Sequence, residues 1–274
     1  MTTQTLSASP PAGPQQKSPP PPARMARIPL RRIVAVELRK SFDTRAGLWL
    51  LASVGLASVL TSGAVIAWAP DDHFTYSTFT TTIAFPMSVI LPIIAALAVT
   101  AEWTQRSGLT TFTVVPHRGR IMLGKGIALV SVALPATAAA FVVGAAGNVV
   151  GAWVSGNELV WDQSLAAVPY VGLSLALSLA MGLVCGTVIR SSAGAIVAFF
   201  VVSFVVPPLL GLLAMTQDWF RDVQPWVDLD HQLAALLRGS FDSEQWTQLA
   251  AASGLWLVLP FAVGMWTLVR SEVK

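Results

Sequence analysis

The chain has few charged residues, and this scarcity limits what kind of protein it can be. Charged residues make up 11% of its 274 residues, whereas hydrophobic residues make up 54%. A soluble domain carries about a quarter charged residues, because its surface must be solvated. The composition therefore predicts an integral membrane protein.

Cysteine and histidine are also scarce. Cys185 is the only cysteine, so neither an intrachain disulfide nor a multi-cysteine metal site can form. Within its apolar run, Cys185 is expected to be a small buried side chain. His73, His117 and His231 lie far apart and never at metal-ligand spacing. We therefore expect no metal site and no cofactor in this chain.

The apolar runs contain no ionisable residue. Six runs are long enough to span a bilayer, and none contains Asp, Glu, Lys, Arg or His: residues 48–68, 82–101, 126–150, 165–189, 193–213 and 249–268. Carriers coupled to protons or ions place ionisable groups at membrane depth, so their absence disfavours a secondary carrier or channel. The sequence thus predicts an all-α membrane protein with six transmembrane helices.

Motifs for chemistry are missing as well. The sequence has no Gly-x-x-x-x-Gly-Lys-Ser/Thr loop for nucleotide phosphates. No catalytic Ser/His/Asp set or paired carboxylates lie at membrane depth. We therefore expect that the chain is not an enzyme, and that any energy for transport comes from another subunit.

What the sequence does have is an uneven distribution of basic residues. Of the 17 Lys and Arg residues, 15 fall before the first run, in the segment 102–125, at Arg190 or at the C-terminus. Only Arg221 and Arg238 fall on the other side. The positive-inside rule then places both termini in the cytoplasm of a multi-pass cell-membrane protein. Because retention explains this positive charge and no nucleic-acid-binding signature is present, we expect no nucleic-acid partner.

Two segments precede the first span. Residues 1–28 are rich in proline and polar residues and are predicted to form a disordered cytoplasmic tail, leaving residues 29–274 as the membrane domain. From Pro29, apolar residues recur at helical spacing with arginines on the opposite side, which is typical of an amphipathic helix in the membrane interface. Lys40 adds to the basic character of Arg39. Glu37 falls on the apolar stripe, either as a snorkelling or locally paired carboxylate or as a contact to the segment 102–125.

The fourth run carries small residues at four-residue spacing, which places them on one helix face. They are Ser174, Ser178, Gly182 and Gly186. We expect this face to pack closely against another helix. A substrate-lining face is the alternative.

Prolines and aromatic residues mark two further features. Pro86 and Pro92 predict a kink in the second span, and Pro207 with Pro208 predicts a break in the fifth. Residues 215–248 are too apolar for a free loop and too polar to span. Short helices at the outer interface fit that segment.

The segment 102–125, which we call the connector, is the one long polar and basic stretch between two apolar runs. Glu102 and Arg106 are four residues apart and share a helix face, while Gly108 allows a turn. Phe112 and its apolar neighbours have no lipid to contact in a cytoplasmic segment. Burial in a partner would stabilise them by about 1.5–3 kcal/mol for each large side chain.

The connector, with the six-span layout and the amphipathic entry helix, resembles the permease subunits of ABC-2 class (ATP-binding cassette) transporters. The residues that carry the resemblance are Glu102, Arg106, Gly108, Pro116, Arg118, Arg120 and Lys125. It covers residues 29–274. It implies that the connector docks on a separate ATPase subunit, which binds ATP and Mg²⁺, and that two permease units, identical or homologous, pair around the substrate path.

This resemblance predicts the permease subunit of an exporter. The alternative from another class is a non-transporting sensor or assembly scaffold, for which the basic residues serve only to fix topology. Co-purification of an ATPase subunit distinguishes the two.

Overall fold

The computed structural model describes residues 29–43, 45–70, 73–104 and 118–270. Within these ranges the fold is all-helical, and the only β interaction is an isolated bridge between Thr75 and Val160. The elements, in chain order, are α1 (Leu30–Asp43), α2 (Arg45–Trp68), α3 (Tyr76–Thr104), α5 (Arg118–Ser155), η2 (Leu165–Ala167), α6 (Val168–Ile189), α7 (Ser192–Phe200), η3 (Val201–Val205), α8 (Val206–Thr216), α9 (Asp218–Val227), α10 (Leu229–Leu237), α11 (Ser243–Ser253), η4 (Gly254–Val258) and α12 (Leu259–Arg270).

Five of the described segments are long and apolar enough to cross a membrane. They are Tyr76–Ala101, Gly126–Ser155, Leu165–Ile189, Ser192–Thr216 and Ser243–Thr267. Each corresponds to one of the predicted spans two to six. The predicted first span lies in α2, whose described apolar stretch, Ala52–Trp68, is shorter than these five. The fold is thus that of a multi-pass helical membrane protein.

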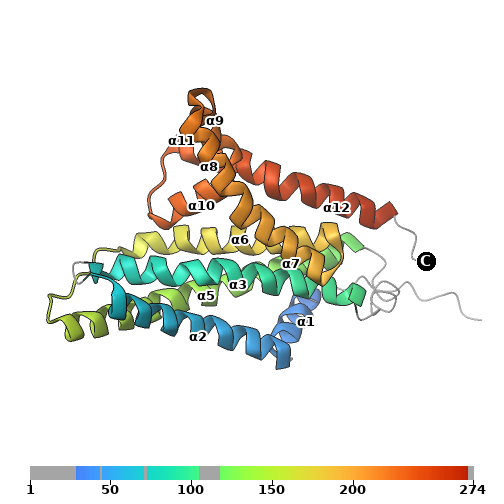
Figure 1. Cartoon of the computed structure of the whole chain (residues 1–274). Helices are drawn as coiled ribbons and strands as arrows, with labels where there is room; N and C mark the ends of the chain where they lie inside the picture. The colour runs from blue at the N-terminus through green and yellow to red at the C-terminus, as the bar shows by residue number, and fades with distance from the viewer. Residues whose placement is uncertain (1–28, 44, 71–72, 105–117, 271–274) are drawn as a thin grey trace, which may run out of the picture.

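The centre of the bundle is the pair α3 and α6. Leu91 and Ala95 of α3 and Leu175 and Leu179 of α6 are all at most 2% exposed, and they share one core. α5 packs against both helices, α2 packs against α3 and α5, and α1 packs against α5 (Figure 1). Buried alanines on α5, such as Ala140, let that helix approach closely.

α7 and α8 are packed much less than the central helices. Only 6% of the apolar stretch of the span Ser192–Thr216 is buried inside the protein, compared with 61% for the span Leu165–Ile189. Figure 1 shows α8 and α12 diverging from the central helices. Exposed apolar surface on this scale requires lipid or another protein around it.

The prediction that Pro207 and Pro208 break the fifth span is wrong. α7 continues into α8 through the π-helical turn η3, in which the Val206 N–H donates to the Val201 carbonyl. A proline ring clashes with the carbonyl four residues earlier, and a wider π turn moves that carbonyl away. The last span has the same arrangement, because the π turn η4 ends at Val258, two residues before Pro260 in α12. α3 likewise continues through Pro86 and Pro92.

The segment 215–248 forms short helices, as the sequence predicts. α9 is strongly amphipathic, and α10 packs against α6. Asp228 caps α10 by accepting a hydrogen bond from the His231 N–H, and Asp242 caps α11 in a capping box with Gln245. Exposed Trp219 and Trp226 are side chains suited to a membrane interface.

Candidate functional site

The two helices beside the connector are described, although most of the connector is not. α3 continues to Thr104, so Glu102 lies in its last turn. α5 begins at Arg118, so Arg118 and Arg120 lie in its first turn and not in a loop. Arg106, Gly108, Phe112 and Pro116 lie outside the described residues. The predicted docking role therefore remains a prediction.

The bundle end that carries the connector is held together by polar contacts between spans. Figure 1 shows that the end of α3, the beginnings of α5 and α7, and the ends of α6 and α12 lie at this end. The Thr100 and Ser192 hydroxyls are 2.8 Å apart and join α3 to α7. Arg190 ends α6 in the left-handed region with φ 56°, and its Nη2 donates to Thr267 Oγ1 at 2.6 Å. The C-terminal end of α3 is thereby linked to α7, and the C-terminal end of α6 is linked to α12.

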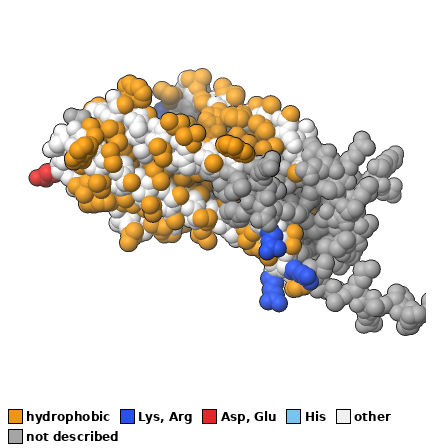
Figure 2. Space-filling model, turned by 90° about the horizontal axis from the view of Figure 1, so that it is seen from below, with side chains coloured by type: hydrophobic (Ala, Val, Ile, Leu, Met, Phe, Trp, Pro, Cys, Tyr) orange, Lys and Arg blue, Asp and Glu red, His pale blue; other side chains and the backbone are white. Residues whose placement is uncertain are grey.

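α1 lies across the same end. Leu38 packs against the central core, while Arg31, Arg32 and Arg39 are exposed. Figure 2 shows basic side chains gathered at this end, beyond a surface that is mostly hydrophobic. This is the arrangement that the predicted interface helix requires. The side chains of Glu37 and Lys40 lie outside the described residues.

The small-residue face of α6 divides into two parts. A Cβ atom on Gly182 would lie 1.9 Å from the Pro92 carbonyl oxygen, and one on Gly186 would lie 3.0 Å from the Ala96 oxygen. Only glycine permits this approach between α3 and α6. Further along the helix, Ser174 and Ser178 line a cavity instead. The structure thus places packing and cavity-lining residues on one face.

That cavity has a volume of about 570 Å³, is partly open, and is lined by residues of α3, α6, α7, η3, α8, α9, α10 and η4. Its lining is more apolar than polar and includes Phe85, Phe199 and Trp256. The Ser174 hydroxyl donates to the Leu233 carbonyl at 3.3 Å and so ties α6 to α10 at the cavity wall.

Acidic residues lie at the α10 end of the cavity. Asp228 is only 3% exposed, and its carboxylate accepts hydrogen bonds from Gln224 Nε2 at 3.0 Å and from the His231 N–H at 3.1 Å. Asp230 also lines the cavity. Partial burial, and then the neighbouring Asp228 charge, raise the pKa of Asp230 above its ordinary value of 3.8, against the opposing effect of His231. Asp228 is thus the buried member of the pair, whereas Asp230 is exposed.

The sequence analysis did not identify these two carboxylates as site residues. They lie more than 50 positions from Ser174 in the chain, and only the folding of α10 onto α6 brings them together. The only feature of the sequence that pointed to this cavity was the pair Pro207 and Pro208, because these residues follow the π turn η3 and line the cavity.

The opposite bundle end is also fixed by hydrogen bonds. Ser77 donates from its N–H (2.7 Å) and its hydroxyl (2.5 Å) to Asp162, which joins the start of α3 to the loop before α6. Burial alone raises the pKa of the Asp162 carboxyl, but hydrogen bonds from Ser77 and Thr75 outweigh it and hold the pKa below 3.8. The Tyr76 N–H and Asn148 Nδ2 both donate to the Val160 carbonyl.

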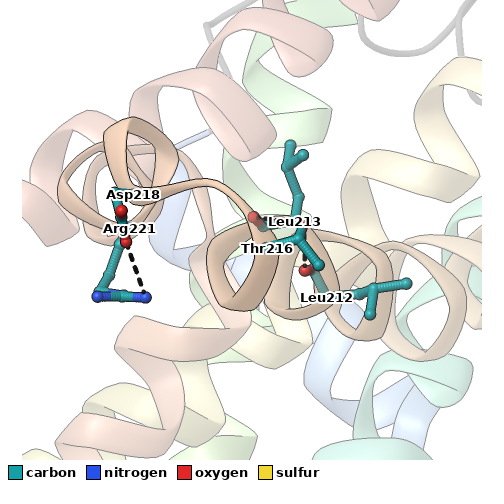
Figure 3. Close-up of polar contacts among 5 residues, drawn as sticks. All are labelled: Leu212, Leu213, Thr216, Asp218 and Arg221. Carbon is teal, nitrogen blue, oxygen red and sulfur yellow. Dashed lines mark hydrogen bonds and ion pairs between the residues drawn. The ribbon is translucent and has the colours of Figure 1, made fainter.

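α8, which lines the cavity, meets α9, which carries exposed charged residues, at a corner. The Thr216 hydroxyl donates to the Leu212 and Leu213 carbonyls at the end of α8 (Figure 3). Arg221, one of the two cations predicted outside, pairs with Asp218 at 3.2 Å. Both side chains are mostly exposed, so this ion pair contributes little stability.

Among the described residues no group of three or more His, Cys, Asp or Glu side chains could hold a metal ion. Comparisons with protein-family models and with curated protein sequences find no match to this chain. The fold and its apolar helices define the class of protein, a multi-pass helical membrane protein.

Proposed function

We propose that the chain is the membrane-spanning permease subunit of an ABC exporter, driven by a separate ATPase subunit that docks on the connector 102–125. One observation carries the proposal. α3, which leads directly into the connector, is also a central helix of the bundle and lines the cavity through Phe85, Ser88 and Val89. A displacement of the connector would therefore move a cavity wall.

Four of the five described spans contain no ionisable residue, and in the fifth, Ser243–Thr267, the only one is the exposed Glu244 in the first turn. This distribution supports an external source of energy. Movement of α3 by an ATPase needs no proton or ion site within the membrane. The links from Thr100 to Ser192 and from Arg190 to Thr267 would carry the displacement to α7 and α12.

The proposal includes a sixth span and a cytoplasmic location for both termini. α2 has 24 residues and a length of about 36 Å at 1.5 Å per residue, enough for a hydrocarbon core of about 30 Å. With α2 counted, the basic residues of α1, the connector, Arg190 and Arg270 all fall on one side, as the positive-inside rule requires of the cytoplasmic face of a cell membrane. A second permease unit completes the transporter, and its interface is expected to use the exposed apolar surface of α7 and α8.

The test is co-purification with the candidate ATPase, together with ATP turnover in the reconstituted complex. Arg106→Glu and Phe112→Ala should leave the protein inserted and folded but should reduce both readouts at least tenfold. Arg238→Glu and Leu165→Ala are the matched controls, because these exposed side chains lie away from the connector end. Unchanged coupling in both connector variants would exclude the connector as the docking site. If no ATPase co-purifies with the wild type, the scaffold function becomes the better explanation.

A further inference from the structure

The cavity between α3, α6, η3 and α10 has a size typical of a binding site. Pockets for small molecules have volumes of roughly 300–1,000 Å³ and mostly apolar walls with a few placed polar groups. This cavity has about 570 Å³ and lies within a single chain. Phe85 of α3 and Phe199 and Phe204 near η3 provide aromatic walls.

The π turn η3 forms another wall of the cavity. In this five-residue turn the backbone hydrogen bond joins residues five positions apart, instead of four as in an α-helix. Ser203, within the turn, lines the cavity together with Pro207. Such π turns occur frequently at functional sites. Here the turn adds the hydroxyl group of Ser203 to those of Ser174 and Ser178 in a lining that is mostly apolar.

The ionisable residues of the cavity are mainly acidic. Asp228, Asp230 and His231 line it, and no Lys or Arg is present among the described residues that do so. The hydrogen bonds that Asp228 accepts come from an amide and a backbone N–H, neither of which carries a charge. A carboxylate that is 3% exposed is costly to bury without a counter-charge. A positively charged ligand in the cavity would supply that charge.

From this arrangement we propose that the cavity binds a lipophilic organic cation, with its positive charge beside Asp228 and Asp230 and its hydrophobic body between the phenylalanine side chains. The aromatic faces add a cation–π attraction. A divalent metal ion does not fit, because Ca²⁺ takes six to eight oxygen ligands and Mg²⁺ six, whereas this lining is mainly apolar. An anionic or neutral amphiphile would leave the carboxylates without a counter-charge.

The test measures binding to the purified full-length chain in detergent, with no ATPase present. The probe is radiolabelled tetraphenylphosphonium, and the matched anion is tetraphenylborate, which has nearly the same shape and the opposite charge. Equilibrium dialysis against excess unlabelled probe separates saturable binding from partition into micelles. We expect saturable binding of the cation at one site per chain, and none of the anion.

Three variants locate the site. Asp228→Asn/Asp230→Asn should weaken cation binding at least tenfold, because asparagine keeps the helix cap and removes the charge. Asp218→Asn/Asp222→Asn changes the net charge equally on exposed side chains of α9 outside the cavity, and it should bind like the wild type. Ala234→Phe fills the cavity from its α10 wall and should abolish binding while the thermal midpoint stays within a few degrees of wild type.

Several results would overturn the proposal. They are equal binding of the cation and the anion, no saturable binding, or unchanged affinity in Asp228→Asn/Asp230→Asn. Loss of binding in Asp218→Asn/Asp222→Asn as well would also overturn it, since that would indicate a general surface-charge effect. Because the measurement needs no ATPase, its failure would leave the proposed permease function untouched, and a failure of ATPase coupling would leave the cation site untouched.

Discussion

Gly182→Ala is the sharpest test of how α3 and α6 pack. The added Cβ would lie 1.9 Å from the Pro92 carbonyl oxygen, 2.5 Å from its carbonyl carbon and 2.6 Å from its Cα. All three are backbone atoms, so no side-chain rotation can relieve the overlap. Ordinary contact begins near 3.4 Å, so the two helices must separate by about 1.5 Å at this point.

The cost follows from that separation. Overpacking a well-packed core typically costs about 1–3 kcal/mol. Because the backbone of Pro92 cannot rotate away from the added methyl group, we expect a cost near the upper end of this range. Leu91 and Leu179 lie in the same interface and would lose contacts as the helices move apart. The higher helix propensity of alanine offsets up to about 1 kcal/mol of this cost. The net destabilisation is about 2 kcal/mol, or roughly 4–8 °C in thermal midpoint for a protein of this size.

The assay is thermal unfolding of the purified protein in detergent, followed by the loss of the monodisperse size-exclusion peak. Gly63→Ala is the matched control, since its Cβ on α2 would meet no atom within 4 Å. That control should unfold at or slightly above the wild-type temperature. Gly186→Ala should fall between the two, because its contact with the Ala96 oxygen is 3.0 Å.

The reasoning would be refuted if Gly182→Ala and Gly63→Ala had the same midpoint. In that case α3 and α6 could not approach each other as closely as described. A loss of cavity binding without a change in midpoint would likewise show that Gly182 acts through the cavity and not through packing.

Three further predictions address topology, the loop contact and the base of the bundle. Tags in the N-terminal tail, in the connector and at the C-terminus should be protected in spheroplasts and a tag near Asn157 accessible, and an accessible connector tag would contradict the proposed orientation. The lowered pKa of Asp162 stabilises the folded state above the ordinary value of 3.8, and this contribution is lost as the pH falls through the folded pKa. Asp162→Asn should therefore unfold at a lower temperature than wild type at pH 7, and the difference should shrink towards pH 3; a constant difference would argue against the charge. Thr267→Val removes the acceptor for Arg190 and should cost about 1.5–3 kcal/mol in thermal unfolding. Thr216→Val, whose hydroxyl bonds only its own helix, should cost less, and equal losses would show that the Arg190 contact is unimportant.

The sequence alone predicted the helical class and the positions of five spans, for a definite physical reason. A bilayer needs about 20 apolar residues in a helix, so spans appear directly as runs in the sequence. The run 165–189 matches the described span to the residue. The short helices in 215–248 were also predictable, because their composition suits an interface and not a span.

The sequence could not predict how the chain passes its proline pairs. A proline removes one hydrogen bond and adds one steric clash, and either a break or a π turn resolves the clash. The choice depends on whether the two helical halves remain held by their neighbours. Here Phe199 packs in a core with Leu229 and Leu236 of α10, and the helix continues through η3.

The small-residue face of α6 shows the same division between sequence and structure. Spacing alone placed Ser174, Ser178, Gly182 and Gly186 on one side of a helix, since helical periodicity is a property of the local backbone. What each residue meets depends on contacts between segments far apart in the chain. Only the tertiary structure decided that α3 lies against the two glycines, and that α10 brings Asp228 to a cavity beside the two serines.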